Sequence, residues 1–191
     1  MARTPSKEAH AKVLKAVLEL IGERGVEGTS MDAIAAAAGV SKATVYKHWE
    51  NKDALLVDAI RVQGAKSPTF ASGNLRKDLT DLLTYLAHKS RSQEPARFWP
   101  NIISYAASNP DFGKVLQERL FAPRREGLLA MLAAGAAAGV LEPNIDPDLA
   151  ADLLIGPIMH RRFVNNNNVP PELPEKVVAV FFRAFAPAIR E

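Results

Sequence analysis

The densest group of side chains able to bind a charged polymer lies between residues 42 and 52. It combines cations with a hydroxyl, a phenol and an imidazole: Lys42, Thr44, Tyr46, Lys47, His48 and Lys52. Short polar groups near the start of a helix suit base edges, and lysines suit phosphates. With Ser30 just upstream, these residues predict a DNA-binding surface.

Two short helices joined by a tight turn would position this group, over residues 30–49. The first carries apolar residues at helical spacing: Met31, Ile34, Ala35 and Ala38. Ser30 and Ser41 are suited to cap the two helices, and Gly39 can end the first in the left-handed conformation. Val45 and Trp49, four residues apart, predict the buried side of the second helix. This arrangement predicts a helix-turn-helix, although an ordinary helical hairpin with a solvated basic face fits the same spacing.

The segment GVSKATVYKHWENKDALL favours the first interpretation. It resembles the tetracycline-repressor (TetR) family of bacterial regulators, whose DNA-binding domains read much like AGVSKGTLYYHFPSKEAL. The matching residues are Ala38, Gly39, Val40, Ser41, Lys42, Thr44, Tyr46, His48, Asn51, Lys52, Asp53, Ala54 and Leu55. Trp49 stands where the family usually has Phe, Glu50 replaces a common Pro, and Lys47 replaces a frequent aromatic or basic residue. The resemblance is strong over residues 8–60.

The resemblance also implies roles for single residues in this set. The position of Thr44 often lies at the groove, and the positions of Tyr46 and Lys52 commonly bind phosphate. Lys52 would begin a helix whose free N–H groups also favour a phosphate, and we expect its side chain to be exposed.

Composition and charge set broad limits on the remaining possibilities. The 191 residues include no cysteine, which leaves no disulfide framework or thiolate metal site, and the formal net charge is only +3. No apolar run is long enough for a membrane span, and the first residues lack the apolar core of a secretory signal. We therefore expect a cytoplasmic protein in which a local basic patch, rather than overall charge, binds DNA.

Helical patterns cover the rest of the chain without strand alternation, which predicts an all-α fold. Residues 7–24 and 52–65 complete an N-terminal three-helix helix-turn-helix domain with one connecting helix. Residues 66–74 are rich in Ser, Pro and Gly and predict a domain boundary. The expected domains are residues 1–66 and a larger helical dimerisation and effector domain, residues 67–191.

Five helices are expected in the larger domain, over residues 75–91, 95–107, 109–138, 147–164 and 171–189. Pro123 should kink or split the third, and Gly156-Pro157 should interrupt the fourth, because an interior proline removes a hydrogen bond. The order of Trp-Pro, Asn-Pro-Asp, Arg-Arg, Gly-Val-Leu and Gly-Pro in this region resembles the C-terminal domain of one TetR subgroup.

The family resemblance implies a small-molecule effector held among these helices. Its expected pocket residues are Leu83, Leu86, Phe98, Trp99, Ile102, Tyr105, Phe121, Met131 and His160. Apolar residues at helical spacing are more often core than pocket wall, and His160 also fits an interface or surface position.

The last helix is apolar nearly all round, so it requires cover on more than one side. We expect a homodimer joined through the last two helices. The predicted joint is Leu153, Leu154, Ile158, Phe181, Phe182 and Phe185.

Together these features predict a sequence-specific DNA-binding transcriptional regulator, a repressor released from a palindromic double-stranded operator by a small molecule. No nucleophile, paired acid or metal-ligand spacing accompanies His48 or His160, so no enzyme activity, metal or cofactor is expected. One alternative is a helix-turn-helix regulator without a pocket, controlled by a protein partner or constitutive. The other is a helical enzyme or scaffold that merely contains the hairpin.

Overall fold

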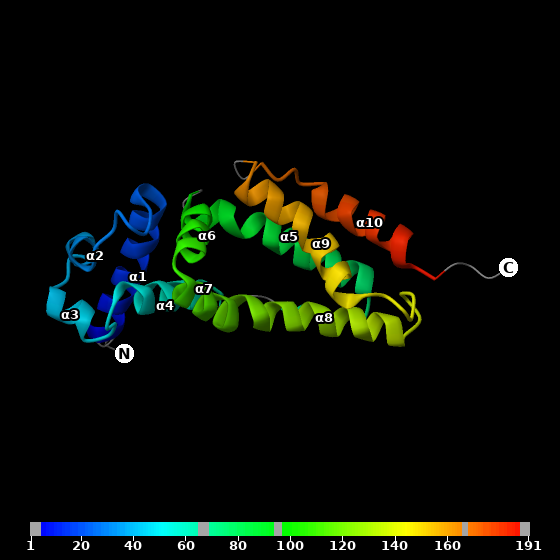
Figure 1. Ribbon diagram of the computed structural model, residues 1–191, viewed down its shortest axis with the longest axis horizontal. Helices are drawn as coiled ribbons and strands as arrows, with labels where there is room; N and C mark the ends of the chain where they lie inside the picture. The colour runs from blue at the N-terminus through cyan, green and yellow to red at the C-terminus, as the bar shows by residue number, and fades with distance from the viewer. Residues whose placement is uncertain (1–4, 65–68, 94–96, 166–167, 188–191) are drawn as a thin grey trace. The chain divides into compact units, whose positions relative to one another are not determined.

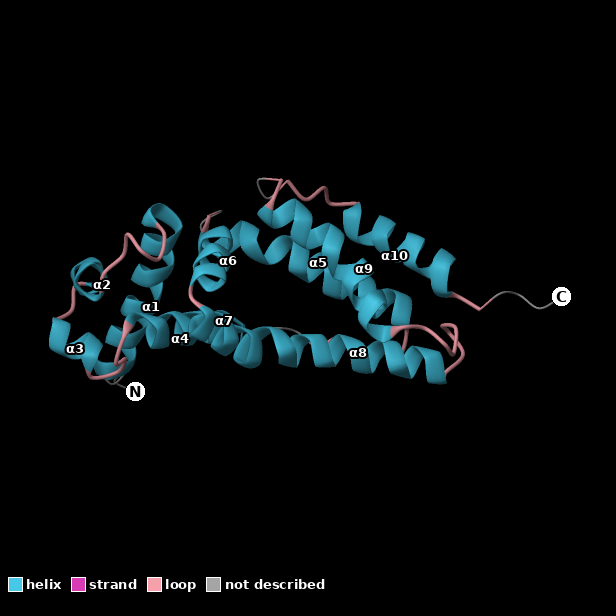
Figure 2. Ribbon diagram, viewed as in Figure 1, coloured by secondary structure: helices cyan, strands magenta, loops and turns pink. Residues whose placement is uncertain are grey.

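The computed structural model describes residues 5–64, 69–93, 97–165 and 168–187, and over these ranges its regular elements are all helical (Figures 1 and 2). The predicted all-α fold is confirmed. In chain order the elements are α1 (Pro5–Arg24), α2 (Met31–Ala38), α3 (Lys42–Tyr46), α4 (Lys52–Gly64), α5 (Leu75–Gln93), α6 (Phe98–Ser108), α7 (Pro110–Leu116), the π-helical turn η1 (Gln117–Phe121), α8 (Ala122–Ala137), α9 (Pro147–Phe163) and α10 (Leu173–Phe185).

The chain forms two compact units. The first comprises Met1–Ser67 and Gln93–Phe121, and the second comprises Pro68–Ser92 and Ala122–Glu191. Thus α6, α7 and η1 pack with the N-terminal helices, although the sequence-based division after residue 66 assigns them to the larger domain. The division into two units describes which helices pack together, whereas the division after residue 66 assigns DNA binding and effector binding to parts of the chain. The second division stays a prediction.

The first unit closes around apolar residues of α1, α2, α3 and α4, with Trp49 added from the segment after α3. Its buried core includes Val13, Val17, Ile21, Ile34, Val45, Trp49 and Leu56. Phe98 and Ile102 of α6 and Phe112 of α7 join the same cluster. The sequence did not predict this addition, because the apolar face of α6 indicates burial without indicating against which helices.

The second unit packs α5, α8, α9 and α10 around a separate cluster. Leu79, Leu83, Leu132, Leu154 and Ile158 are fully buried in it. Within this unit α9 and α10 lie side by side (Figure 1).

An ion-pair bridge joins α8 to α9 in the second unit. The Arg125 guanidinium donates to Asp148 Oδ1 at 2.8 Å and to Asp152 Oδ1 at 2.7 Å. Its pKa is raised by the hydrogen bond to Asp152 first and by that to Asp148 second. The bridge therefore fixes the start of α9 against α8.

The two internal prolines behave differently. Pro123 directly follows η1, so the predicted break in the helix takes the form of a π-helical turn before the proline. The predicted interruption at Gly156-Pro157 is wrong, since α9 runs unbroken from Pro147 to Phe163. Pro157 lies on the exposed side of α9. The backbone carbonyl one turn earlier, which lacks an N–H partner because of the proline, can hydrogen-bond to water there.

Candidate nucleic-acid interface

The predicted caps and turn of α2 and α3 are confirmed. Ser30 Oγ accepts a hydrogen bond from the Ala33 N–H at 3.1 Å, and Ser41 Oγ accepts one from the Thr44 N–H at 3.2 Å. Gly39 ends α2 with φ of 66°, in the left-handed region that favours glycine. These local bonds give two helices held at a fixed turn.

Burial on one side of α3 sets which residues face outward. Val45 is 0% exposed and Trp49 is 5% exposed, so both lie in the core of the first unit. On the other side Tyr46 is 53% exposed, and Lys42 and Lys47 are exposed as well. The outward face of α3 is therefore cationic and polar, as predicted.

Lys42 does not point freely into solvent. Its ammonium lies 2.5 Å from Asp32 Oδ2 of α2, and both side chains are more than half exposed. An exposed pair contributes little stability, about 0–1 kcal/mol, and salt weakens it. A phosphate can therefore compete with Asp32 for this ammonium at small cost.

Two of the hydroxyls expected at the interface also take part in helix capping: that of Ser30 is a cap, and that of Thr44 contacts a cap. Thr44 is half-buried and its Oγ1 lies 2.8 Å from Ser41 Oγ, while Ser30 caps α2. A hydroxyl has one donor and two acceptor lone pairs, so a capping hydroxyl retains capacity for another partner. Both residues therefore combine a local structural role with remaining hydrogen-bonding capacity.

His48 lies in an aromatic group that the sequence did not reveal. Its ring centroid is 5.8 Å from that of His10 on α1 and 5.5 Å from that of Trp49. The His10 and Trp49 rings are 4.7 Å apart. His10 and His48 are too distant in sequence for spacing to indicate their contact.

Asp58 of α4 anchors this aromatic group. Its Oδ2 accepts from Trp49 Nε1 at 3.1 Å and lies 3.1 Å from His10 Nε2, and its Oδ1 accepts from Arg61 Nη2 at 2.8 Å. Burial alone would raise the pKa of Asp58, but the hydrogen bonds from Arg61 and Trp49 and the nearby charges of Arg61 and His10 together lower it. The ionised carboxylate thus holds the end of the α3 segment against α1 and α4.

Lys52 differs from the expectation of an exposed cation. The side chain is half-buried, and its ammonium donates to the carbonyl oxygens of Val26 at 2.5 Å and Thr29 at 3.0 Å. Sequence spacing could not reveal these partners, since they lie in the connection between α1 and α2, more than 20 residues away.

The residues predicted to line an effector pocket divide between the two units. One group is in the first unit: Phe98, Trp99, Ile102, Tyr105 and Phe121. The other is in the second unit: Leu83, Leu86, Met131 and His160. Phe98, Ile102 and Leu83 are fully buried in the core, whereas His160 is exposed. The set therefore does not form one contiguous group within either unit.

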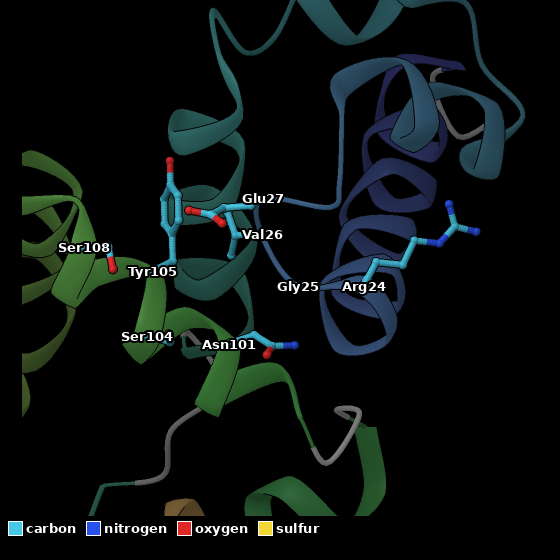
Figure 3. Close-up of a pocket in the computed structure, with 8 residues that line it drawn as sticks. All are labelled: Arg24, Gly25, Val26, Glu27, Asn101, Ser104, Tyr105 and Ser108. Carbon is cyan, nitrogen blue, oxygen red and sulfur yellow. The ribbon is translucent and has the colours of Figure 1, made fainter.

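A polar pocket of about 240 Å³ lies in the first unit, and Tyr105 alone among the predicted residues lines it. The other lining residues are Arg24, Gly25, Val26, Glu27, Asn101, Ser104 and Ser108. The side chains of Tyr105 and Glu27 approach each other, while the Arg24 guanidinium points away (Figure 3). This pocket is open and polar, so it is not the apolar pocket that the sequence predicts.

The predicted dimer joint requires a correction. Leu154 and Ile158 are 0% exposed, and Phe181 and Phe182 are also buried, all within the second unit of the same chain. A helix that packs in its own unit must turn its largest apolar side chains inward, so these four are not an open surface. Phe185 is half-buried.

Of the six predicted joint residues, Leu153 remains clearly exposed, at 49%. Leu149 on the same helix and Val180 on α10 are exposed to a similar degree. The apolar residues available to a partner are thus different from most of those that helical periodicity indicated.

In the described part of the chain, no three His, Cys, Asp or Glu residues gather into a group that could hold a metal ion. None of the described helices has the length and apolar character needed to cross a membrane.

A capped helix, a glycine turn and a second helix with an outward cationic face define a helix-turn-helix DNA-binding protein. Residues 13–59 match the model of the bacterial regulatory proteins of the tetR family, and residues 71–181 match the tetracyclin repressor-like C-terminal domain. The chain belongs to the TetR family of transcriptional regulators, which confirms the resemblance seen in the sequence.

Individual relatives agree with this membership. The chain is 30% identical over 168 residues to the uncharacterized HTH-type transcriptional regulator YdeS of Bacillus subtilis, covering 87% of this chain and 84% of YdeS. It is 27% identical over 153 residues to the DNA-binding transcriptional repressor TetR of Mycobacteroides abscessus, covering 79% and 80%. Among solved structures, the flavonoid-responsive regulator FrrA is 27% identical with a TM-score of 0.67, covering 95% of this chain and 98% of FrrA.

Proposed function

We propose that this protein is a repressor that binds a two-fold symmetric operator as a homodimer and leaves it when a small molecule binds. The observation that carries the proposal is the exposed cationic face of α3 on a helix whose start and turn are fixed by local bonds. The proposed DNA-facing residues are Ser30, Lys42, Thr44, Tyr46, Lys47 and His48.

Within this set, different residue types suit phosphate contacts and base contacts. Lys42 and Lys47 offer cations for phosphates, and Thr44 offers a short hydroxyl in the first turn of α3 for a base edge. Tyr46 and His48 lie at the end of α3 and just beyond it, and both side chains are exposed, which suits a phenol and an imidazole to phosphate contacts. Phosphate contacts fix the register, so discrimination between sequences depends on the residues of the first turn.

A homodimer follows from the size of the reading surface. One copy of α3 covers only a few base pairs, so selectivity requires two copies about one turn of DNA apart, ~34–36 Å. The proposed joint uses the exposed apolar residues Leu149 and Leu153 of α9 with Val180 of α10. A two-fold pairing would bury the same patch on both chains.

Control by a small molecule is supported by the resemblance to FrrA, a flavonoid-responsive regulator. An effector would act by its different affinities for the DNA-binding and released conformations. The helical region of residues 67–191 is the proposed effector and dimerisation domain, and residues 1–66 are the proposed DNA-binding domain. A binding and control role of this kind requires no catalysis.

The operator hypothesis is tested by retaining fragmented genomic DNA on the purified protein and sequencing the retained fragments. We expect one enriched palindromic motif, with half-site centres about one helical turn or a multiple apart. The double variant Lys42→Ala, Lys47→Ala is the matched control and should lose the enrichment. Retention of fragments without a shared motif, equal for both proteins, would reject sequence-specific reading.

A further inference from the structure

Lys52 is the one member of the sequence-predicted DNA-binding set whose charged atom is directed into the protein. It is the first residue of α4, and its ammonium donates to the carbonyls of Val26 and Thr29 at 2.5 and 3.0 Å. An ammonium has three donors, and hydrogen bonds from a charged donor are shorter and stronger than those between neutral groups. Two of the three donors of Lys52 are therefore used within the first unit.

The acceptors belong to the connection that delivers the chain to the helix-turn-helix. Thr29 is 2% exposed, and its hydroxyl donates to the Gly25 carbonyl at 2.8 Å. The next residue, Ser30, caps α2. Lys52 thus ties the start of α4 to the residues that set where α2 begins.

A second set of contacts holds the same end of α4 to α6. The Tyr105 hydroxyl donates to Asp53 Oδ1 at 3.1 Å, and the Tyr105 ring centroid lies 5.8 Å from the Lys52 ammonium. Asn101 of α6 donates to the Ile21 carbonyl of α1 at 2.7 Å. Tyr105 is thus a further neighbour of the Lys52 ammonium, whose side chain cannot reach outward without losing both carbonyl partners.

We infer that the Lys52 side chain is a positioning element for operator reading, and that its ammonium does not contact a phosphate. Its ammonium fixes the α1–α2 connection against α4 and thereby fixes α2, which carries α3 through the Gly39 turn. Loss of this tie would keep the cations on the surface of α3, but α3 would no longer be held in the position that a specific site requires. The inference rests on the proposed operator binding.

Salt dependence distinguishes positioning from phosphate contact. Each phosphate neutralised by a cation adds about 0.9 to the slope of log affinity against log salt concentration. Removal of a phosphate contact lowers that slope and weakens binding to specific and random DNA alike. Removal of a positioning residue should weaken specific binding, with the slope and the affinity for random DNA unchanged.

The test compares the wild-type protein with Lys52→Met and Lys47→Met. Affinities for the operator and for a scrambled duplex are measured by fluorescence anisotropy at several salt concentrations, well below the unfolding temperature of each variant. For Lys52→Met we expect an operator affinity about tenfold lower, equivalent to ~1.4 kcal/mol, with an unchanged slope and unchanged scrambled-duplex binding. For Lys47→Met we expect a slope lower by about 0.9 and losses on both duplexes.

Lys52→Arg keeps the charge and covers the case in which Lys52→Met does not fold. Arginine binds phosphate well, but its planar fork differs from an ammonium placed between two carbonyls. Selective loss of operator affinity in Lys52→Arg supports the inference. A reduced slope in Lys52→Met, or wild-type operator binding by either variant, overturns it. Equal wild-type affinity for operator and scrambled duplex would instead reject the proposed function.

Discussion

Trp49 offers the sharpest test of how the reading helix is held. The side chain is 5% exposed, packs on the His10 ring and donates from Nε1 to Asp58 at 3.1 Å. Replacing it by Ala removes a buried aromatic and leaves a cavity, at a cost of about 3–5 kcal/mol in the free energy of unfolding. A unit of this size has little stability in reserve, so we expect Trp49→Ala to lose the folded helix-turn-helix.

Trp49→Phe separates the ring from its hydrogen bond. The aromatic volume is mostly kept, while Asp58 loses one donor and retains His10 and Arg61. Hydrogen bonds to charged groups contribute about 1.5–3 kcal/mol, and the remaining donors should hold the cost near the lower end of that range. The expected order of unfolding free energies is therefore wild type, then Trp49→Phe, then Trp49→Ala.

The measurement is urea unfolding followed by far-ultraviolet circular dichroism, with operator binding measured on the same samples. Combining Trp49→Phe with Asp58→Asn in a double-mutant cycle isolates the Nε1–carboxylate bond, for which we expect a coupling of about 1 kcal/mol. If the two single losses simply add, the bond is energetically absent. If Trp49→Ala is as stable as wild type, the burial of Trp49 is refuted.

Three further outcomes are expected. Lys42→Ala should lower the salt slope of operator binding by about 0.9, measured by anisotropy, and leave unfolding nearly unchanged because its ion pair is exposed. Leu153→Glu should fold, since the side chain is 49% exposed, but should sediment as a monomer with weaker operator binding; an unchanged dimer would place the joint elsewhere. Burial raises the pKa of Asp58, but the hydrogen bonds from Arg61 and Trp49 and the charges of Arg61 and His10 together lower it below its ordinary 3.8. The Asp58 contribution to stability is therefore fully present above pH 3.8 and lost as pH falls through the lower folded-state pKa, so Asp58→Asn should flatten the acid fall in urea midpoint.

Local interactions explain why the helix-turn-helix was predictable from the sequence. A serine cap acts on a backbone N–H a few residues away, and a left-handed glycine acts at its own position. Ser30 and Ser41 therefore cap their helices, and Gly39 ends α2, as the sequence predicts. The burial of Val45 and Trp49 follows from the same short range, because i and i+4 lie on one face of a helix.

Apolar periodicity gave much poorer predictions in the second unit. A stripe of Leu and Phe has the same spacing whether it covers a core, a ligand or a second chain. Phe181 and Phe182 therefore looked like a joint and instead lie in the core, while Leu153 on the neighbouring helix stays exposed. The packing of α10 against the other helices of its unit decides between these outcomes, and those contacts are not local.

The three lysines near α3 show how far residue type alone can define an interface. Lys42, Lys47 and Lys52 have the same charge and occur within one short segment. Lys42 lies beside an exposed carboxylate, which a phosphate can displace, whereas Lys52 lies beside two backbone carbonyls in a half-buried connection. A carboxylate left without its lysine stays hydrated at the surface, but a half-buried carbonyl left without its donor has lost a hydrogen bond that water replaces poorly. The same residue type is therefore expected to be accessible to DNA at Lys42 and is held by carbonyls of the fold at Lys52.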